Sequence, residues 1–122
     1  MKILATIISC LIVFSWVISR PYAEQPTVIA SYYGERYRNR PTASHYKNWQ
    51  YSYFNPDHLT AAHKTLPFGT KLKVSYKGKS VIVVISDRGP FVKNRTLDLS
   101  KAAFQKLENT RVGLIKVKIE LL

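Results

Sequence analysis

An alternating segment, a turn and an apolar run that stops abruptly place the strongest constraint on the fold of this chain. Residues 71–76 (KLKVSY) alternate charged or polar and apolar side chains, residues 77–79 (KGK) suit a turn, and residues 80–86 (SVIVVIS) are mostly apolar. Alternation with a period of two is typical of a strand with one buried face, and a short continuous apolar run predicts a strand buried on both faces. The sequence therefore predicts a β-hairpin whose second strand, residues 80–86, lies in the core.

Other segments extend the same β-rich pattern. Residues 27–33 (TVIASYY) are rich in β-branched and aromatic side chains, which favour a strand, and residues 112–121 predict another. The positions expected to face inward in the latter are Ile115, Val117, Ile119 and Leu121. Residues 59–66 are ambiguous, and Ser100 is expected to cap a short helix that runs to about Glu108. We therefore expect a mainly β fold of about six short strands, a small barrel or sandwich, with one or two short helices.

The first 23 residues carry the pattern of a secretory signal peptide. Lys2 precedes an apolar run over residues 3–18, and the segment closes on the small residue Ala23. The run is shorter than the roughly 18 to 20 residues that span a bilayer as a helix, which favours a cleaved leader over a membrane anchor. We expect cleavage after Ala23, with Ser19 as the alternative, and a single domain over residues 24–122. The expected destination is the periplasm or the cell exterior, with membrane contact only through an uncleaved leader.

Charge and cysteine content narrow the functional classes. The 122-residue chain carries 19 Lys and Arg against 7 Asp and Glu, a formal net charge of +12. In an exported protein this charge suits an anionic polymer such as a bacterial cell wall better than nucleic acid, and a merely solvated basic surface is the alternative. The only cysteine, Cys10, lies in the expected leader, which excludes a disulfide-stapled fold, thiol catalysis and a cysteine-based zinc site in the domain. We expect a monomer that uses no cofactor.

Two carboxylates are candidates for acid–base chemistry. Asp87 ends the apolar run at a tight turn, Asp87-Arg88-Gly89-Pro90, where fixed geometry and partial desolvation suit a general acid. The alternative is that Asp87 only bonds the backbone of that turn. Asp98 lies two residues before the expected helix cap, so we assign it a structural role, bonding nearby backbone N–H groups.

The histidines and aromatic residues suggest binding rather than metal chemistry. His58 and His63 are five residues apart, a spacing that does not place two metal ligands on one helical face, and we predict no metal site with them or with His45. His63 suits a hydrogen bond to a carboxylate or a sugar hydroxyl. A cluster of aromatic rings could stack on sugars, with about half of the rings expected in the core. Its members are Tyr32, Tyr33, Tyr37, Tyr46, Trp49, Tyr51, Tyr53 and Phe54.

The order of several short segments resembles that of the rare lipoprotein A family of bacteria. These segments are residues 30–34 (ASYYG), 42–44 (TAS), 59–70 (LTAAHKTLPFGT), 86–91 (SDRGPF) and 97–100 (LDLS). The resemblance extends over residues 28–121, nearly the whole expected domain. It implies a six-stranded double-psi β-barrel, the fold that this family shares with expansins.

The same resemblance implies an activity and a set of site residues. Family members are endolytic peptidoglycan transglycosylases that cut the β-1,4 bond after N-acetylmuramic acid without water, leave a 1,6-anhydro end and prefer strands that lack stem peptides. By motif position, Asp87 is the implied general acid and then base, and His63 is implied to position substrate or tune that carboxyl. The implied substrate contacts are Tyr32, Tyr33, Asn55, Thr60 and Arg88, and the implied structural neighbours are Gly89, Pro90 and Asp98.

One segment departs from the family pattern. Relatives follow the Thr-Ala-Ser segment with Gly-Glu, an aromatic residue and Asp or Asn, whereas here Ser44 precedes a longer stretch, residues 45–53, without an acidic residue. Ser52 stands nearest to the expected Glu, and Asn55 stands where an Asp is often found. This departure keeps a second hypothesis open, in which the chain is a non-catalytic, expansin-like module that binds peptidoglycan through its aromatic loop and basic surface.

Overall fold

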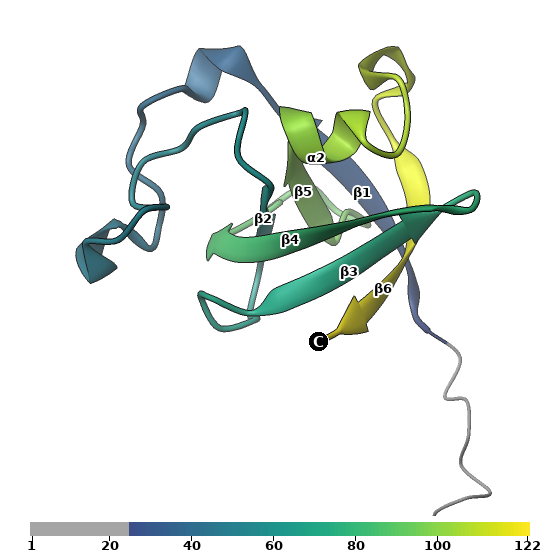
Figure 1. The fold of residues 1–122 in the computed structure, drawn as a ribbon, viewed down its shortest axis with the longest axis horizontal. Helices are drawn as coiled ribbons and strands as arrows, with labels where there is room; N and C mark the ends of the chain where they lie inside the picture. Colours follow the sequence, from purple (N-terminus) through teal and green to yellow (C-terminus); the bar gives the residue numbers. More distant parts are fainter. Residues whose placement is uncertain (1–24) are drawn as a thin grey trace, which may run out of the picture.

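Six strands close into a barrel in the computed structural model, which describes residues 25–122 (Figure 1). The strands are β1 (Thr27–Tyr33), β2 (Thr60–His63), β3 (Lys71–Tyr76), β4 (Lys79–Asp87), β5 (Leu97–Ser100) and β6 (Ile115–Leu121). The helical elements are α2 (Lys101–Gln105) and the 3-10 turns η1 (Glu35–Tyr37), η2 (His45–Lys47) and η3 (Thr110–Val112). The predicted mainly β fold is confirmed. The expected leader, residues 1–23, lies outside the described residues, and no helix within residues 25–122 has the length and apolar character to cross a bilayer.

The order of strands around the barrel is β1-β5-β2-β4-β3-β6. Two pairs, β1–β5 and β2–β4, run parallel, and the remaining neighbours run antiparallel. Parallel partners need crossover connections, and two such crossovers interlaced in one closed sheet give the double-psi β-barrel that the resemblance implies. The predicted hairpin is β3–β4, which turns at Lys77 and Gly78 with φ of 45° and 79°, as a two-residue type I′ turn requires.

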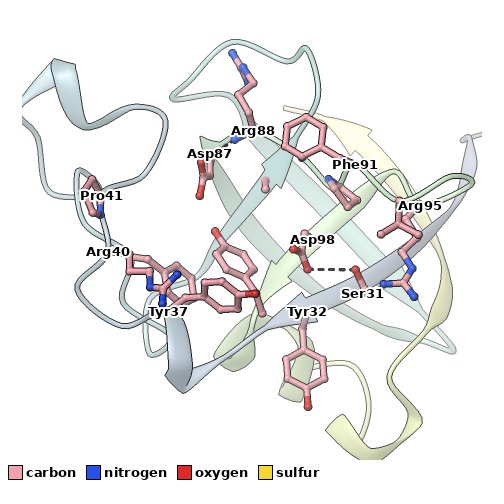
Figure 2. A pocket seen from close by; sticks show the side chains of 16 residues that line it. Ser31, Tyr32, Tyr37, Arg40, Pro41, Asp87, Arg88, Phe91, Arg95 and Asp98 are labelled. Carbon is pink, nitrogen blue, oxygen red and sulfur yellow. Dashed lines mark hydrogen bonds between the residues drawn. The ribbon is translucent and has the colours of Figure 1, made fainter.

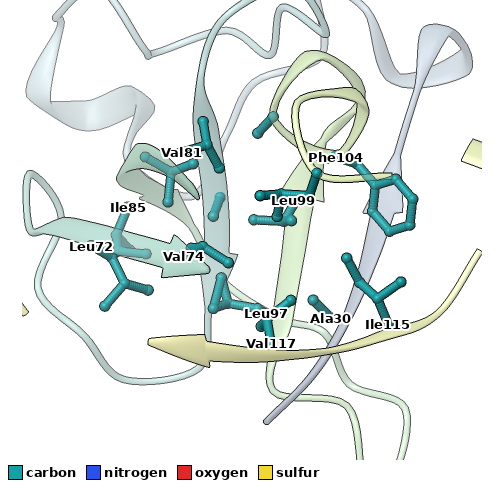
Figure 3. Packing of buried hydrophobic residues seen from close by; sticks show 14 residues of the cluster. Ala30, Leu72, Val74, Val81, Ile85, Leu97, Leu99, Phe104, Ile115 and Val117 are labelled. Carbon is teal, nitrogen blue, oxygen red and sulfur yellow. The ribbon is translucent and has the colours of Figure 1, made fainter. Parts of the chain in front are cut away.

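Inward side chains from the strands, together with α2, fill the barrel (Figure 3). In β4, alternate residues Val81, Val83 and Ile85 are buried, whereas Ile82 is 51% exposed. The prediction that residues 80–86 are buried on both faces is therefore wrong. The strand forms a barrel wall whose burial alternates over residues 81–83, and only near its end are two consecutive residues, Ile85 and Ser86, both buried.

The ends of α2 and β6 depart slightly from the prediction. The Ser100 hydroxyl accepts the N–H of Ala103 at 3.2 Å, which confirms the predicted cap, but α2 ends at Gln105 instead of near Glu108. β6 begins at Ile115 because residues 110–112 form η3. Leu121, predicted to face inward, is 62% exposed at the last position of β6, so that part of the prediction is wrong.

The connection from β1 to β2, residues 34–59, forms a lobe beside the barrel (Figure 1). It is held mainly by its own backbone hydrogen bonds: the N–H of Phe54 donates to the carbonyl of Arg40 at 2.8 Å, and the N–H of Thr42 donates to the carbonyl of Ser52 at 2.9 Å. The lobe (residues 34–59) is therefore ordered without joining the barrel sheet.

Candidate active site

A groove of about 520 Å³ lies between the lobe and the barrel, and two carboxylates line it (Figure 2). Asp87 ends β4 and Asp98 lies within β5. Five aromatic residues and three arginines contribute to the same lining. The volume is in the range of sites that bind small ligands, and acids between aromatic and cationic walls suit a polar, ring-containing ligand such as a sugar.

Ala62 on β2 lies between the two carboxylates. Its register partners are Asp98 on β5 and Asp87 on β4, the latter at a local irregularity. Neighbouring strands are about 4.8 Å apart, so the backbones that carry the two acids are separated by roughly 10 Å. The small Ala62 side chain also lines the groove, and it leaves the space between the acids open to a ligand.

Asp98 is a carboxyl held in a partly buried, weakly solvated position. Its Oδ1 accepts a hydrogen bond from the Ser31 hydroxyl at 3.2 Å. Burial raises the pKa of Asp98 to about 6, against the opposing effects of the Ser31 hydrogen bond and the Arg95 charge and with a further contribution from Asp87. A carboxyl of this kind carries its proton into the mildly acidic range, as a general acid must. Within residues 25–122, the Asp98 side chain accepts no hydrogen bond from a backbone N–H group, although the sequence predicted such bonds.

Asp87 is held differently, by two backbone donors on one oxygen. Its Oδ1 accepts the N–H of Ala43 at 2.8 Å and the N–H of Arg88 at 2.9 Å. The first bond ties the lobe to the barrel across the groove, and the second lies within the Asp87-Arg88-Gly89-Pro90 turn. Because both partners are backbone donors, this oxygen is held as a hydrogen-bond acceptor and the orientation of the carboxyl is fixed.

The Arg88 guanidinium lies away from both acids. It donates to the carbonyls of His63 at 3.1 Å and Leu66 at 2.8 Å, and its central carbon lies 3.8 Å from the centroid of the Phe68 ring. Figure 2 shows the side chain extending out of the groove. Arg88 therefore lines the groove while its charged group is already bound by protein atoms.

Tyr33 forms part of the groove wall with a buried hydroxyl. Its ring stacks on Phe54 with centroids 4.0 Å apart, and among residues 25–122 the hydroxyl oxygen has no hydrogen-bond partner. Burial raises the pKa of Tyr33 well above its usual value, and the charges of Asp87 and Asp98 add to the rise. Tyr33 is thus a neutral donor beside the two acids, with buried Thr60 next to it.

His63 and Asn55 do not line the groove. The His63 Nδ1 accepts the N–H groups of Thr65 at 3.1 Å and Leu66 at 3.0 Å, and its ring borders a separate, largely apolar hollow. Burial lowers the pKa of His63, and the Arg88 and Lys64 charges add to this. The Asn55 Oδ1 accepts the N–H of Asp57 at 2.9 Å. Among residues 25–122, no three acidic, histidine or cysteine side chains gather as metal ligands would.

The remaining expected residues divide between groove and interior. Gly89, Pro90 and Tyr32 border the groove, but the Tyr32 ring points away from the acids in Figure 2 and packs against Phe104 with ring centroids 5.0 Å apart. Ser52, which stands nearest to the missing Glu, is buried, and its hydroxyl accepts the N–H of Trp49 at 2.8 Å inside the lobe. The lobe stretch without acids therefore supplies internal hydrogen bonds in place of a third carboxylate.

Sequence reasoning missed several groove residues. Ser31 belongs to the ASYYG segment, and its polarity within an otherwise apolar and aromatic strand was a usable signal. Phe91, 82% exposed beside the Gly89-Pro90 turn, was also inside a recognised segment. Arg40 and Arg95 had no local signal, because only the packing of the lobe against the barrel brings them to the same groove.

Comparison with known proteins agrees with this architecture. Residues 25–119 match the sequence profile of the lytic transglycolase family. The endolytic peptidoglycan transglycosylase RlpA of Neisseria meningitidis serogroup A is 45% identical over 93 residues, covering 75% of this chain and 36% of the relative. RlpA of Rickettsia felis is 45% identical over 101 residues, covering 79% and 42%. The chain thus spans less than half the length of these relatives, and only 25% of a relative from a Nostoc species.

Solved structures show the same fold at lower sequence similarity. The Streptomyces papain inhibitor superposes with a TM-score of 0.62 at 21% identity, covering 84% of this chain and 97% of that one. The expansin of Clavibacter michiganensis superposes with a TM-score of 0.63 at 20% identity, covering 81% of this chain and 50% of that one. Together with the sequence matches, these findings establish that the chain belongs to the RlpA-like lytic transglycolase family, as a double-psi β-barrel domain.

Proposed function

We propose that this domain is an endolytic peptidoglycan lytic transglycosylase that acts in the bacterial cell envelope. The observation that carries the proposal is the pair of carboxylates on the two sides of Ala62, one of which has a pKa raised to about 6. The relatives are named for this activity, and the groove offers the two proton-transfer groups that the reaction needs. The periplasm or the cell exterior is the proposed location, and a monomer is the proposed state.

Asp98 is the proposed general acid. The family resemblance implies Asp87 for both proton transfers, but Asp98 is the carboxyl whose pKa burial raises to about 6, so we assign it the first transfer. Asp98 donates that proton to the glycosidic oxygen, the bond from this oxygen to C1 of N-acetylmuramic acid breaks, and the oxygen leaves as the hydroxyl of the next sugar. The carbon that remains is electron-deficient and reacts with the nearest hydroxyl.

Asp87 is the proposed general base. The C6 hydroxyl of the same N-acetylmuramic acid attacks C1, and its proton passes to Asp87, which forms the 1,6-anhydro ring without water. One proton has left Asp98 and one has arrived at Asp87, so exchange with solvent restores the starting state. The donors from Ala43 and Arg88 hold one Asp87 oxygen in place while the carboxylate receives the proton.

The aromatic walls are the proposed sugar contacts. Phe91 is largely exposed beside the acids, and Tyr33 and Tyr37 line the facing wall. Such rings offer flat apolar faces to sugar rings. Arg88 is proposed to act on substrate only indirectly, with His63 as the residue whose carbonyl helps to hold it, and Asn55 and Thr60 are proposed to support the lobe and Tyr33.

Product identity tests the proposal. Purified protein is incubated with peptidoglycan glycan strands free of stem peptides, and released fragments are analysed by mass spectrometry. A lytic transglycosylase yields 1,6-anhydro ends, which are lighter by one water than hydrolytic products. Asp98→Asn and Asp87→Asn are each expected to lower the release rate by about 10²- to 10⁴-fold, because each removes one proton transfer and keeps the side-chain size.

Two outcomes would contradict the proposal. Reducing ends in place of anhydro ends would indicate hydrolysis. If wild type releases nothing but sediments with the polymer as firmly as both variants do, the domain is a binding module of the expansin-like kind.

A further inference from the structure

The stretch of the lobe without acidic residues, residues 45–53, packs against the connection between β2 and β3. The Tyr46 ring lies next to Phe68 of that connection, with ring centroids 6.1 Å apart. The Trp49 ring lies beside Gly69, where a β-carbon would be 4.0 Å from the Trp49 Cζ3 atom. This stretch is therefore held by the barrel as well as by the rest of the lobe.

A series of buried polar side chains joins Trp49 to the segment that precedes it. The Trp49 Nε1 donates to the Ser44 hydroxyl at 3.0 Å, and the Ser44 and Thr42 hydroxyl oxygens are 2.9 Å apart. The Thr42 hydroxyl donates to the carbonyl of Tyr51 at 2.9 Å. Each hydroxyl has one proton, so all of these bonds are made when Ser44 donates to Thr42. Ser44 is 0% exposed and Thr42 is 2% exposed, so water competes little for the bonds.

The two buried hydroxyls flank the residue that contacts Asp87. Ala43 lies between Thr42 and Ser44 in the chain and is itself exposed, and its N–H donates to Asp87 Oδ1 at 2.8 Å. Ala43 has no polar side chain, so the direction of its N–H depends on the backbone that Thr42 and Ser44 hold on either side. The position of this donor is thus linked, through Ser44, to the packing of Trp49 against the barrel.

We infer that Trp49 and Ser44 are positioning residues that hold the Ala43 N–H against Asp87 and thereby fix the orientation of this carboxylate. The inference rests on the proposed function, because it takes Asp87 as the base. Oδ1 of Asp87 is occupied by the N–H groups of Ala43 and Arg88, which leaves Oδ2 to receive the C6 proton. A loosened Ala43 N–H allows the carboxylate to rotate, which slows the proton transfer and leaves the binding of the glycan unchanged.

Amide hydrogen exchange, measured by nuclear magnetic resonance, tests the position of this N–H without requiring cleavage. Ala43 is exposed, so its bond to Asp87 is what slows the exchange of its amide, and Asp87→Ala gives the rate without that bond. Trp49→Phe removes the indole donor and keeps an aromatic ring. It should speed exchange at Ala43 about fivefold, on the scale of one neutral hydrogen bond. Ser44→Ala also removes the link to Thr42 and should speed exchange further.

Kinetics on glycan strands free of stem peptides tests the consequence for the reaction. Trp49→Phe should lower kcat about fivefold and leave KM unchanged, because Trp49 acts on the proton transfer and not on binding. Ser44→Ala should lower kcat by a larger factor, again with KM unchanged. A fall in kcat without faster exchange at Ala43, or faster exchange without a fall in kcat, would contradict the inference.

Arg38→Gln is the matched control within the lobe. Arg38 is bound by Glu35 and Asp57, and its side-chain hydrogen bonds within residues 25–122 do not reach residues 42–49. This variant should leave both kcat and the exchange of Ala43 at their wild-type values. Equal effects of Arg38→Gln and Trp49→Phe would overturn the inference, because they would indicate a general loosening of the lobe. A wild-type protein that forms no anhydro products would instead reject the proposed function, and faster exchange in Trp49→Phe would still support the positioning of Ala43.

Discussion

The two sides of the groove hold their functional groups by different means. On the barrel side, Ser31, Ala62 and Asp98 occupy register positions of three paired strands. On the lobe side, Arg40 and Ala43 depend on hydrogen bonds within a loop and on one bond to Asp87. This difference indicates that proton transfer and polymer binding have separate structural requirements. Proton transfer needs a buried carboxyl in a fixed position. Binding of a long polymer needs exposed groups that reach across the groove.

The largest expected effect is on the free energy of unfolding, and it should be greater for a variant in the barrel core than for one in the lobe. Ile85→Ala removes a fully buried side chain from β4 and should lower the free energy of unfolding by about 2–5 kcal/mol. Trp49→Phe removes the indole donor to the Ser44 hydroxyl, a 3.0 Å bond inside the lobe, and should cost only about 1 kcal/mol. Urea denaturation followed by circular dichroism measures both, and an equal loss would contradict the expectation that the barrel core contributes more to stability than this bond of the lobe.

The next effect concerns the burial of Asp98 on the barrel side. Burial raises its pKa from the usual 3.8 to about 6, so the native state binds this proton more tightly than the unfolded chain does. The resulting contribution to stability is present at low pH and is lost as pH rises through about 6. Asp98→Asn removes the ionisation, and it should be up to about 3 kcal/mol more favourable relative to wild type at pH near 7 than at pH near 4.

Denaturant unfolding of the wild type and Asp98→Asn at both pH values checks this expectation. If the two proteins differ in unfolding free energy by the same amount at both pH values, Asp98 is well solvated. The barrel side would then lack the buried carboxyl that distinguishes it from the lobe side.

A smaller effect concerns the hydrogen bond from Ser31 to Asp98 on the barrel side of the groove. The Ser31 hydroxyl bond favours the ionised form of Asp98, so Ser31→Ala should raise the pKa of Asp98 further. If Asp98 is the acid, the decline in kcat/KM at high pH moves to higher pH, by less than about one unit for one neutral hydrogen bond. A pH–rate profile from pH 5 to 9 measures the shift, and a movement toward lower pH would contradict the assignment of Asp98 as the acid.

Local patterns predicted those parts of the fold that local physics controls. Period-two alternation identified β3 and β6, β-branched and aromatic composition identified β1, and the Ser100 cap followed from helix-end chemistry. β2 and β5 were not recognised as strands, because each has only four residues and each is stabilised by partners far away in the chain. The resemblance to a known family supplied the barrel topology that no local pattern could specify.

The residues of the candidate site also differ in whether the sequence alone could identify them. Asp87 could be identified because it stops an apolar strand at a Gly-Pro turn, a feature of the sequence alone. The proton-holding character of Asp98 could not, because its pKa depends on burial between β1 and β2. His63 shows the converse: it stands within a recognised segment, yet the fold directs its ring into a hollow outside the groove.

The sequence by itself determined a basic, β-rich domain with an acid at a strand end and segments of a recognisable family, because composition, alternation and turn residues act over a few neighbouring positions. Tertiary structure alone decided which carboxyl is buried, which arginines remain without a carboxylate among residues 25–122, and that the lobe and barrel enclose one groove. Desolvation and charge pairing depend on groups brought together from distant parts of the chain, and their effects exist only once the barrel has closed.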